Sequence, residues 1–442
     1  MKRIIFGNSF ATLLFFAAAG LRAADEIATN AADEVWSVHG QATVVEQAHP
    51  GFHAGYSGPN SMDAKADQHD TITSTLFFGR KLWDGGAIYF DPEMAQGFGL
   101  SHTYGIAGFP NGEASRAGKD ASEFYVARVF LRQTINFGGE SENVEADQNQ
   151  LAGRQSVERL TITAGKMSAV DIFDNNTYSH DGRKQFMNWA LMDNGAWDFS
   201  SDARQYTWGL VAEWNEKNWT LRWAHFLATP VPNGKEFDWN PARAFAEVLE
   251  WERRYDLNGH PGAVRLLGFA NRAHLGDYRE ALDDPQYGGD IANTRDGFRF
   301  KYGGGVNAEQ EIAKDFGVFS RVGWNDGRTE SWMFTEIDET ASFGASLKGS
   351  RWNRPDDVAG IAGVINGIST DHRDYLASGG TGFIIGDGRL NYAPEEIAET
   401  YYSIALPENF ALTLDYQLIN NPAYNSDRGP ANFFAARLHA EF

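Results

Sequence analysis

The feature that most constrains the fold is the alternating segment AARLHAEF, residues 435–442. From Phe434 to Phe442 every second position is apolar. Arg437, His439 and Glu441 occupy positions between them. Because successive side chains of a strand point to opposite faces, this segment predicts a strand with one apolar and one charged face. A soluble protein would bury the apolar face, whereas a membrane barrel turns it toward lipid and lines a wet lumen with the charged face.

The same period of two recurs along the chain and favours strands over helices, whose apolar period is 3.6. The clearest examples are residues 36–44, 87–94, 125–137, 206–214, 219–223, 298–302 and 410–418. In two of these segments the apolar parity includes Tyr125 and Tyr206, so both rings are predicted to face away from the polar lumen. Residues 244–255, by contrast, fit a helix as well as a strand.

The connections between the predicted strands alternate between short and long. The short ones are residues 84–86, 215–218, 258–262, 313–315 and 407–409, and the long, polar ones are 46–69, 95–122, 168–204, 229–243, 275–295, 363–396 and 421–431. Short periplasmic turns and long extracellular loops are typical of an outer-membrane barrel. Residues 138–157 depart from this pattern, because an acidic, Asn- and Gln-rich segment stands where a short turn is expected.

The predicted fold class is therefore all-β, a transmembrane antiparallel β-barrel. Counting strands between the breaks gives about 16, an even number as in bacterial single-chain barrels. A barrel of that size encloses an aqueous channel rather than a core filled by side chains. Both ends of the chain then lie on the short-turn, periplasmic side.

The N-terminus has the features of an export signal. Lys2 and Arg3 precede an apolar run that is densest at Leu13–Ala19, and small residues follow near Ala24. This order predicts a signal peptide over residues 1–24 and a barrel domain over 25–442. The alternative is an apolar N-terminal helix of the fold. No later stretch reaches the ~18 consecutive apolar residues of a spanning helix. Because an exported membrane barrel is typical of the Gram-negative outer membrane, we expect the protein to be located there.

Composition narrows the possible partners. The formal net charge of −21 argues against nucleic acid as a ligand. The chain has no cysteine, so disulfides cannot stabilise it and a closed sheet is a plausible substitute. No metal-binding or cofactor motif stands out, and none is predicted.

Tryptophans near the short turns support the membrane interpretation. Trp83, Trp214, Trp219 and Trp251 lie close to predicted strand ends, where a girdle of aromatic rings meets the membrane interface. The alternative is the aromatic core of a soluble β-sandwich, but the opposite parity is charged too often for a dry second layer. By the same reasoning Phe442 is expected at the lipid interface.

Several long stretches resemble the carbohydrate-selective porin family of the OprB type. They are DPEMAQGFGLSHTYGIAGFPNGEA (91–114), TEIDETASFGASLKGSRWNRPDD (335–357), GDGRLNYAPEEIAETYYS (386–403) and NPAYNSDRGP (421–430). The resemblance covers essentially the whole mature chain. It implies a 16-stranded outer-membrane channel for mono- or small oligosaccharides such as glucose. It also implies that the final strand, ending in Phe442, is presented to the barrel-assembly machinery.

A pore that selects a neutral sugar should offer paired donors and acceptors at its constriction, with little net charge. Arginine suits this role because its planar fork can donate to two hydroxyls or pair with a carboxylate. The best constriction candidates are Glu93, Arg128 and Arg132, near mid-barrel on adjacent strands. Further pore-lining candidates are Asp91, Arg299, Arg321, Glu336, Asp338 and Glu399. The alternative is that these residues form salt bridges that only stiffen the wall.

Two loops raise further alternatives. Residues 168–204 form the longest predicted loop, which either folds inward and narrows the channel or stays outside. The segment GGTGFIIGDG, residues 379–388, is rich in glycine but lacks the Lys-Ser/Thr pair of a phosphate-binding loop. Asp387 and its acidic neighbours do not have the spacing of an EF-hand calcium site.

Two competing functions are an unselective porin and, less favoured, a secreted glycan hydrolase. The hydrolase interpretation rests on Glu336 and Asp338, which would lie roughly 7 Å apart along a strand. A retaining pair of carboxyls needs a separation of about 5 Å, and no other hydrolase motif occurs. We therefore expect a channel and not an enzyme.

Overall fold

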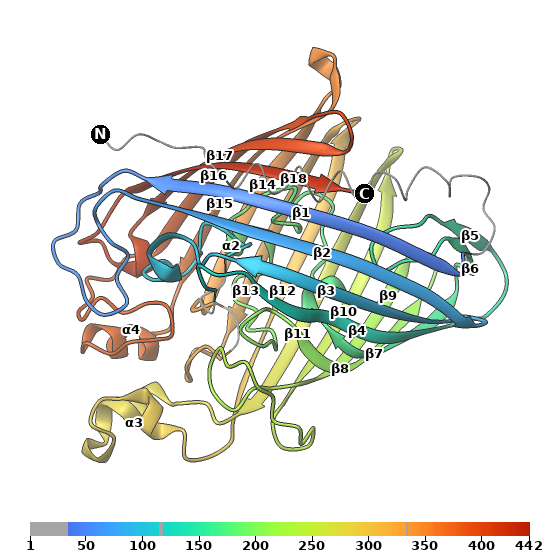
Figure 1. The fold of residues 1–442 in the computed structure, drawn as a ribbon. Helices are drawn as coiled ribbons and strands as arrows, with labels where there is room; N and C mark the ends of the chain where they lie inside the picture. Colours follow the sequence, from blue (N-terminus) through green and yellow to red (C-terminus); the bar gives the residue numbers. More distant parts are fainter. Residues whose placement is uncertain (1–33, 115–117, 333–334) are drawn as a thin grey trace.

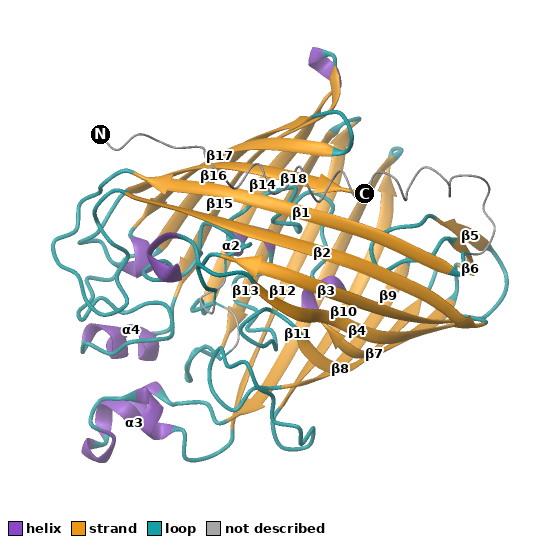
Figure 2. Ribbon diagram, in the orientation of Figure 1, coloured by secondary structure: helices purple, strands orange, loops and turns teal. Residues whose placement is uncertain are grey.

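The computed structural model describes residues 34–114, 118–332 and 335–442; the predicted signal peptide lies outside them. Over this part of the chain, sixteen antiparallel strands close into a barrel, which confirms the predicted fold (Figures 1 and 2). The strands of the barrel are β1 (Trp36–His49), β2 (Asp67–Trp83), β3 (Gly86–Gln96), β4 (Glu123–Asn136), β7 (Arg159–Met167), β8 (Thr207–Asn215), β9 (Trp219–Leu227), β10 (Phe245–Leu257), β11 (His260–Ala273), β12 (Arg299–Ala313), β13 (Phe316–Asn325), β14 (Glu339–Gly349), β15 (Arg354–Gly367), β16 (Glu395–Ala405), β17 (Phe410–Asn420) and β18 (Ala431–Glu441).

Strands β1 and β18 close the barrel. Thr43 lies opposite His439, and the Thr43 hydroxyl is 2.8 Å from the imidazole Nδ1. Beyond β18, Phe442 continues the pairing, since its carbonyl accepts from the Gly40 amide at 2.7 Å. A Cβ at Gly40 would come within 2.4 Å of the Phe442 ring, so only glycine leaves room for the ring beside the exposed Leu76. The terminal ring therefore covers the outer face of the seam.

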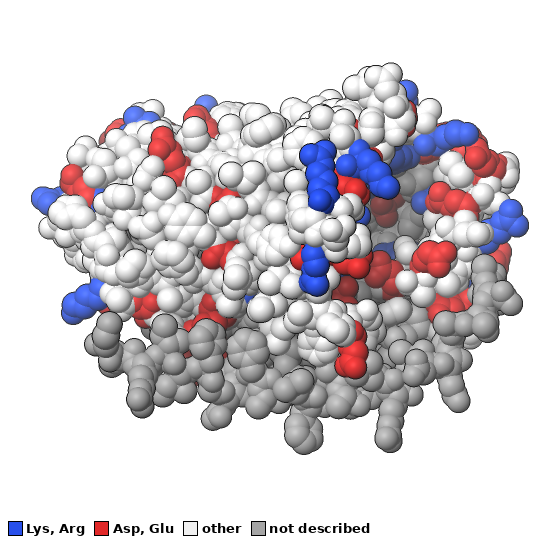
Figure 3. All heavy atoms as spheres, turned by 90° about the horizontal axis from the view of Figure 1, so that it is seen from above, with Lys and Arg blue, Asp and Glu red and all other residues white. Residues whose placement is uncertain are grey.

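The two faces of the sheet have the inverted polarity that the sequence predicts. Large apolar side chains cover the outside; Phe343 and Ile361, for example, are 62% and 65% exposed. Polar side chains such as Arg437 and Gln417 are buried inside. In Figure 3 most of the visible face is white, and charged side chains gather around a hollow at its right-hand end.

Short helices lie mainly in the long loops. They are α2 (Trp189–Met192), α3 (Tyr278–Asp283), α4 (Thr370–Ala377) and the 3₁₀ turns Leu100–Thr103, Ala169–Asp171, Pro285–Tyr287, Ile291–Thr294 and Pro422–Tyr424, with one more, Ser350–Trp352, in a short turn. None of the helices in the described ranges is both long and apolar enough to cross a membrane. Helices α3 and α4 mark the long-loop end of the barrel in Figure 1, and β5 (Ser141–Val144) and β6 (Gly153–Ser156) mark the opposite, short-turn end.

The longest loop folds into the lumen, one of the two alternatives that the sequence leaves open. We call residues 168–206 the inward loop. Its Phe186 is fully buried and lies against Phe319 and Tyr401 of the barrel wall, with ring centroids 5.5 and 4.9 Å apart. Arg437 of β18 donates to the carbonyl of Gly182 in the loop at 2.5 Å. The inward loop is thus a packed part of the barrel interior.

Two side-chain orientations differ from the sequence prediction. Arg128 lies opposite Asp91, but Val126 lies opposite Pro92, so Ala127 is an extra residue in β4. A bulge of this kind reverses the facing of the residues beyond it, and Tyr125 turns into the lumen. Tyr206 precedes the first residue of β8 and also points inward, so strand parity does not apply to it.

Candidate functional site

Two adjoining cavities lie in the lumen beside β3, β4 and β7. The smaller, of about 70 Å³, lies near the long-loop end and is lined by Glu93, Glu123 and Arg204 among others. The larger, of about 540 Å³, extends from the inward loop toward the short-turn end. The residues that line both cavities are Gly112, Glu113, Arg183, Gln205 and Tyr206, and we call this group the eyelet.

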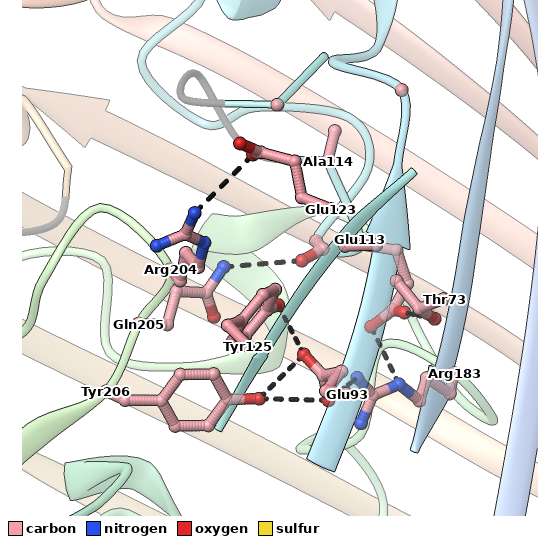
Figure 4. A pocket seen from close by; sticks show the side chains of 14 residues that line it. Thr73, Glu93, Glu113, Ala114, Glu123, Tyr125, Arg183, Arg204, Gln205 and Tyr206 are labelled. Carbon is pink, nitrogen blue, oxygen red and sulfur yellow. Dashed lines mark hydrogen bonds and ion pairs between the residues drawn. The ribbon is translucent and has the colours of Figure 1, made fainter. Parts of the chain in front are cut away.

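Glu93 lies beside the eyelet, and its carboxylate is heavily engaged (Figure 4). Tyr125 and Tyr206 donate their hydroxyls to Oε1 at 2.5 and 3.0 Å. Thr75 donates to Oε2 at 2.6 Å, and Arg183 Nη2 is 3.7 Å from the same oxygen. Since a carboxylate has about four lone-pair sites, little acceptor capacity is left for a passing solute. Glu93 therefore positions two rings and a cation.

Arg183 brings a positive charge from the inward loop into the eyelet. Its Nε is 3.0 Å from Glu113 Oε1, and Thr73 donates its hydroxyl to the other oxygen of Glu113. Burial opposes the charge, but Glu113 and Glu93 outweigh it and raise the pKa of Arg183 above its ordinary value. A guanidinium has five donors, so Arg183 keeps donors that can bind a solute in the eyelet.

Arg128 and Asp171 form a second ion pair, which lines the larger cavity next to the eyelet. The guanidinium donates to both oxygens of Asp171, at 2.7 and 2.6 Å, and lies 5.1 Å over the Tyr206 ring. Its Nη1 is 3.6 Å from Asp91, which is fully buried. Burial inside the barrel raises the pKa of Asp171, but the paired Arg128 more than offsets it, so the pKa lies below its ordinary value.

The acidic, Asn- and Gln-rich segment noted in the sequence lies within residues 137–158, which we call the periplasmic hairpin. It carries the two-stranded sheet of β5 and β6 and sends Asn149 back into the larger cavity. Arg132 donates to the Asn149 carbonyl at 2.8 Å, and the Asn149 amide donates to Asp91 at 2.9 Å. The structure thus brings Glu93, Arg128, Arg132 and Asp91 together along one side of the lumen.

Two other predicted pore residues hold the inward loop in place. Arg321 of β13 is fully buried, donates to the Leu191 carbonyl at 2.9 Å and lies 2.9 Å from Asp174. Glu399 of β16 accepts from the amide of Met187 at 2.6 Å. Neither residue lines the two cavities, because the loop covers both.

The remaining three candidates lie among the long loops. Arg299, the first residue of β12, donates to the Thr294 carbonyl and the Glu280 carboxylate, both at 2.6 Å. Glu336 and Asp338 precede β14 in a loop, so they do not share a strand as the sequence suggested. None of the three lines either cavity.

The glycine-rich segment 379–388 binds a carboxylate of the chain itself. The amides of Ile384 and Ile385 donate to Glu336 at 2.7 and 2.8 Å. Asp387 accepts from the side-chain amide of Asn425 at 3.0 Å. These contacts give the segment a structural role in joining the long loops.

Sequence periodicity does not identify four residues in or beside the eyelet. It predicts the lipid face for Tyr125 and Tyr206, and Glu113 and Arg183 lie in loops, where no periodicity shows which way a side chain points. The only available signal was that residues 168–204 could fold inward. The passage as a whole combines balanced charges with aromatic rings, which suits a neutral solute that has both hydroxyls and apolar C–H faces.

Comparisons with known proteins agree with this geometry. The family described as carbohydrate-selective porin, OprB family, matches residues 76–442. The high-pH structure of OprB from Pseudomonas putida has a TM-score of 0.67 at 15% identity, covering 92% of this chain and 94% of that one. The outer membrane channel DcaP of Acinetobacter baumannii has a TM-score of 0.51 at 9% identity, covering 94% and 99%. Among curated proteins, no sequence matches the chain.

The structural likenesses show a porin-like barrel, and the family match covers most of the chain. The expected family resemblance is thereby confirmed, and the protein is a channel and not an enzyme. It belongs to the carbohydrate-selective porin family of the OprB type and is an outer-membrane channel for sugars.

Proposed function

We propose that the channel passes small sugars such as glucose passively into the periplasm and selects them at the eyelet. The observation that carries this proposal is the pairing of Arg183 with Glu113 at the point where the two cavities meet. In the eyelet the positive charge of Arg183 is paired with the negative charge of Glu113. The eyelet therefore holds strong donors and acceptors without a large net electric field. A neutral polyol can exchange its water shell for these groups, whereas an ion gains less.

The predicted pore residues take different roles in this proposal. Arg183 and Arg128 offer donors to the sugar, and the buried Tyr206 ring supports the Arg128 guanidinium that lies over it. Glu93 and Asp91 act as positioning residues, because Glu93 is saturated and Asp91 is fully buried behind Arg128. Arg132 lines the larger cavity on the periplasmic side of the eyelet. We place Arg299, Arg321, Glu336, Asp338 and Glu399 in the framework that fixes the loops.

Single-channel conductance in planar bilayers tests the proposal. The refolded protein should give steps that glucose blocks saturably. Replacing Arg183 with Ala should raise the half-blocking concentration by at least about tenfold, since a hydrogen bond to a charged group contributes about 1.5–3 kcal/mol. Lys217→Ala, on an exposed turn, is the matched control, and its half-blocking glucose concentration should equal that of the wild type. Steps that no sugar affects would indicate an unselective porin instead.

We further propose that residues 1–24 are removed on export and that the barrel-assembly machinery recognises the last strand through Phe442. The alternation of β18 and the ring of Phe442 on the outer face support the second part. Deleting Phe442 should lower the amount of folded barrel in outer membranes, measured by heat-modifiable migration on gels. Sequencing the N-terminus of the exported protein tests the cleavage, and an N-terminus at Met1 would contradict it.

A further inference from the structure

The periplasmic hairpin is anchored at several points beneath the lumen. Besides the bonds of Asn149 to Arg132 and Asp91, the Gln148 amide donates to Glu441 of β18 at 2.9 Å. The Ala152 amide donates to Glu34, just before β1, at 2.8 Å. These contacts connect the hairpin to strands on both sides of the barrel seam. It is therefore held in a fixed position against the larger cavity.

Several polar atoms along this wall have no hydrogen-bond partner among the described residues. They include Nε2 of Gln41, Nη1 of Arg128, Oδ1 of Asn149 and Oδ1 of Asp91. Gln41, Arg128 and Asn149 line the larger cavity, and Gln41 is only 3% exposed. Buried polar groups are normally hydrogen-bonded, and orphaned ones suggest a missing ligand or solvent. At least two donors and one acceptor are thus left unmatched on residues that line the larger cavity.

Short contacts connect the residues that carry these atoms into one cluster. Arg128 and Asn149 both approach the same oxygen of Asp91, at 3.6 and 2.9 Å. Gln148, next to Asn149 in sequence, donates to Oε1 of Gln41 at 3.3 Å. The cluster runs from β4 across the hairpin to β1, and the rings of Phe77 and Phe130 line the same cavity.

We propose that this cluster is a second sugar subsite, on the periplasmic side of the eyelet and built partly by the hairpin. The inference rests on the proposed function, since it takes the same class of solute. A cavity of about 540 Å³ falls within the ~300–1,000 Å³ range of small-ligand sites. Gln41 and Arg128 donate to sugar oxygens, Asn149 accepts from a hydroxyl, and the Phe rings face C–H groups. A sugar leaving the eyelet then finds replacement partners before it reaches the periplasm.

Two variants test the subsite from different elements. Asn149 has a φ of +55°, which glycine adopts without strain, so Asn149→Gly removes the acceptor, together with the bond to Asp91, while keeping the backbone. Gln41→Met removes the free donor on β1 and the 3.3 Å bond from Gln148, but it keeps the bonds of the hairpin to Arg132 and Asp91. Each should raise the half-blocking glucose concentration about two- to tenfold, the effect of one lost hydrogen bond. Asn143→Gly, exposed on the same hairpin, is the control.

The outcomes separate this inference from the proposed function. A Gln41→Met channel that glucose blocks like the wild type overturns the subsite, whatever Asn149→Gly does, while a weakened Arg183→Ala channel would still support the eyelet. A wild-type channel that no sugar blocks overturns both. Weakened block in both variants with a wild-type-like control supports the subsite, because a displaced hairpin alone would also increase the open-channel conductance.

Discussion

The inward loop and the periplasmic hairpin enter the same lumen from opposite ends but are held by different forces. The inward loop buries Phe186, Trp197 and Phe199 almost completely and forms ion pairs with the barrel wall through Asp171 and Asp174. The hairpin buries few apolar groups and depends on polar contacts around Asn149 and Gln148. Because buried apolar area dominates stability, the inward loop should unfold only together with the barrel. The hairpin, in contrast, should be able to move while the barrel stays folded.

Phe186→Ala should have the largest effect. The ring packs between Phe319 and Tyr401, so its removal leaves a cavity and should cost about 3–5 kcal/mol. We expect lower resistance to urea, followed by tryptophan fluorescence in detergent, together with a larger and noisier conductance. Phe343→Ala on the lipid face is the control, and equal losses in the two variants would contradict a packed loop.

Arg132→Met tests the hairpin in the same way. The substitution removes the donor to the Asn149 carbonyl, a bond to a charged group that contributes about 1.5–3 kcal/mol. Arg132 also lies over the rings of Tyr89 and Phe130, and because the long Met side chain can keep packing against them, the loss should fall mainly on the hairpin. We therefore expect a clear rise in open-channel conductance with little change in the urea midpoint of the barrel.

Arg154→Met, on the exposed edge of β6, is the matched control for the hairpin. It makes the same substitution within the hairpin itself, at a residue that lines neither of the two cavities. A fall in the urea midpoint for Arg132→Met as large as that for Phe186→Ala would show that the hairpin is part of the core. The contrast between the two regions would then be wrong.

The two regions also differ in how far their roles could be predicted. Strand parity placed Glu93, Arg128 and Arg132 in the lumen, since period two depends only on local backbone geometry. It failed at Tyr125, because the bulge at Ala127 leaves no mark in the pattern of apolar residues. Loop residues such as Arg183 have no periodicity, and their positions depend on packing between distant segments.

The hairpin could be recognised as unusual but not interpreted. Its acidic, amide-rich composition stood where a short turn was expected, which marked residues 138–157 as exceptional. The contacts that give it a place in the lumen join Asn149 to Asp91 and Gln148 to Glu441, across long separations in sequence. Composition alone cannot indicate such partners. The deviation from the pattern was nevertheless the most useful guide to the periplasmic side of the channel.

The smallest predicted effect concerns pH and the Arg128–Asp171 pair, which joins the inward loop to the wall of β4. Because Arg128 lowers the pKa of Asp171, the carboxyl stays charged at pH 5. A lowered pKa gives stabilisation that is complete above the ordinary value of about 3.9 and is lost as pH falls through the lowered value. The difference in half-blocking glucose concentration between the wild type and Asp171→Asn should therefore be equal at pH 7 and pH 5, because it cancels the titration of other lining groups such as His180.

Asp171→Asn provides the comparison for that measurement, since it reproduces the protonated carboxyl at any pH. At pH 7 the variant should bind sugar differently from the wild type, because Arg128 loses its anchor to the inward loop and can turn toward the cavity. As the pH falls below about 3.9, the wild type should approach the variant. If the two converge already between pH 7 and pH 5, the pair does not hold Asp171 in its charged form, and the inward loop is attached to β4 by its packing alone.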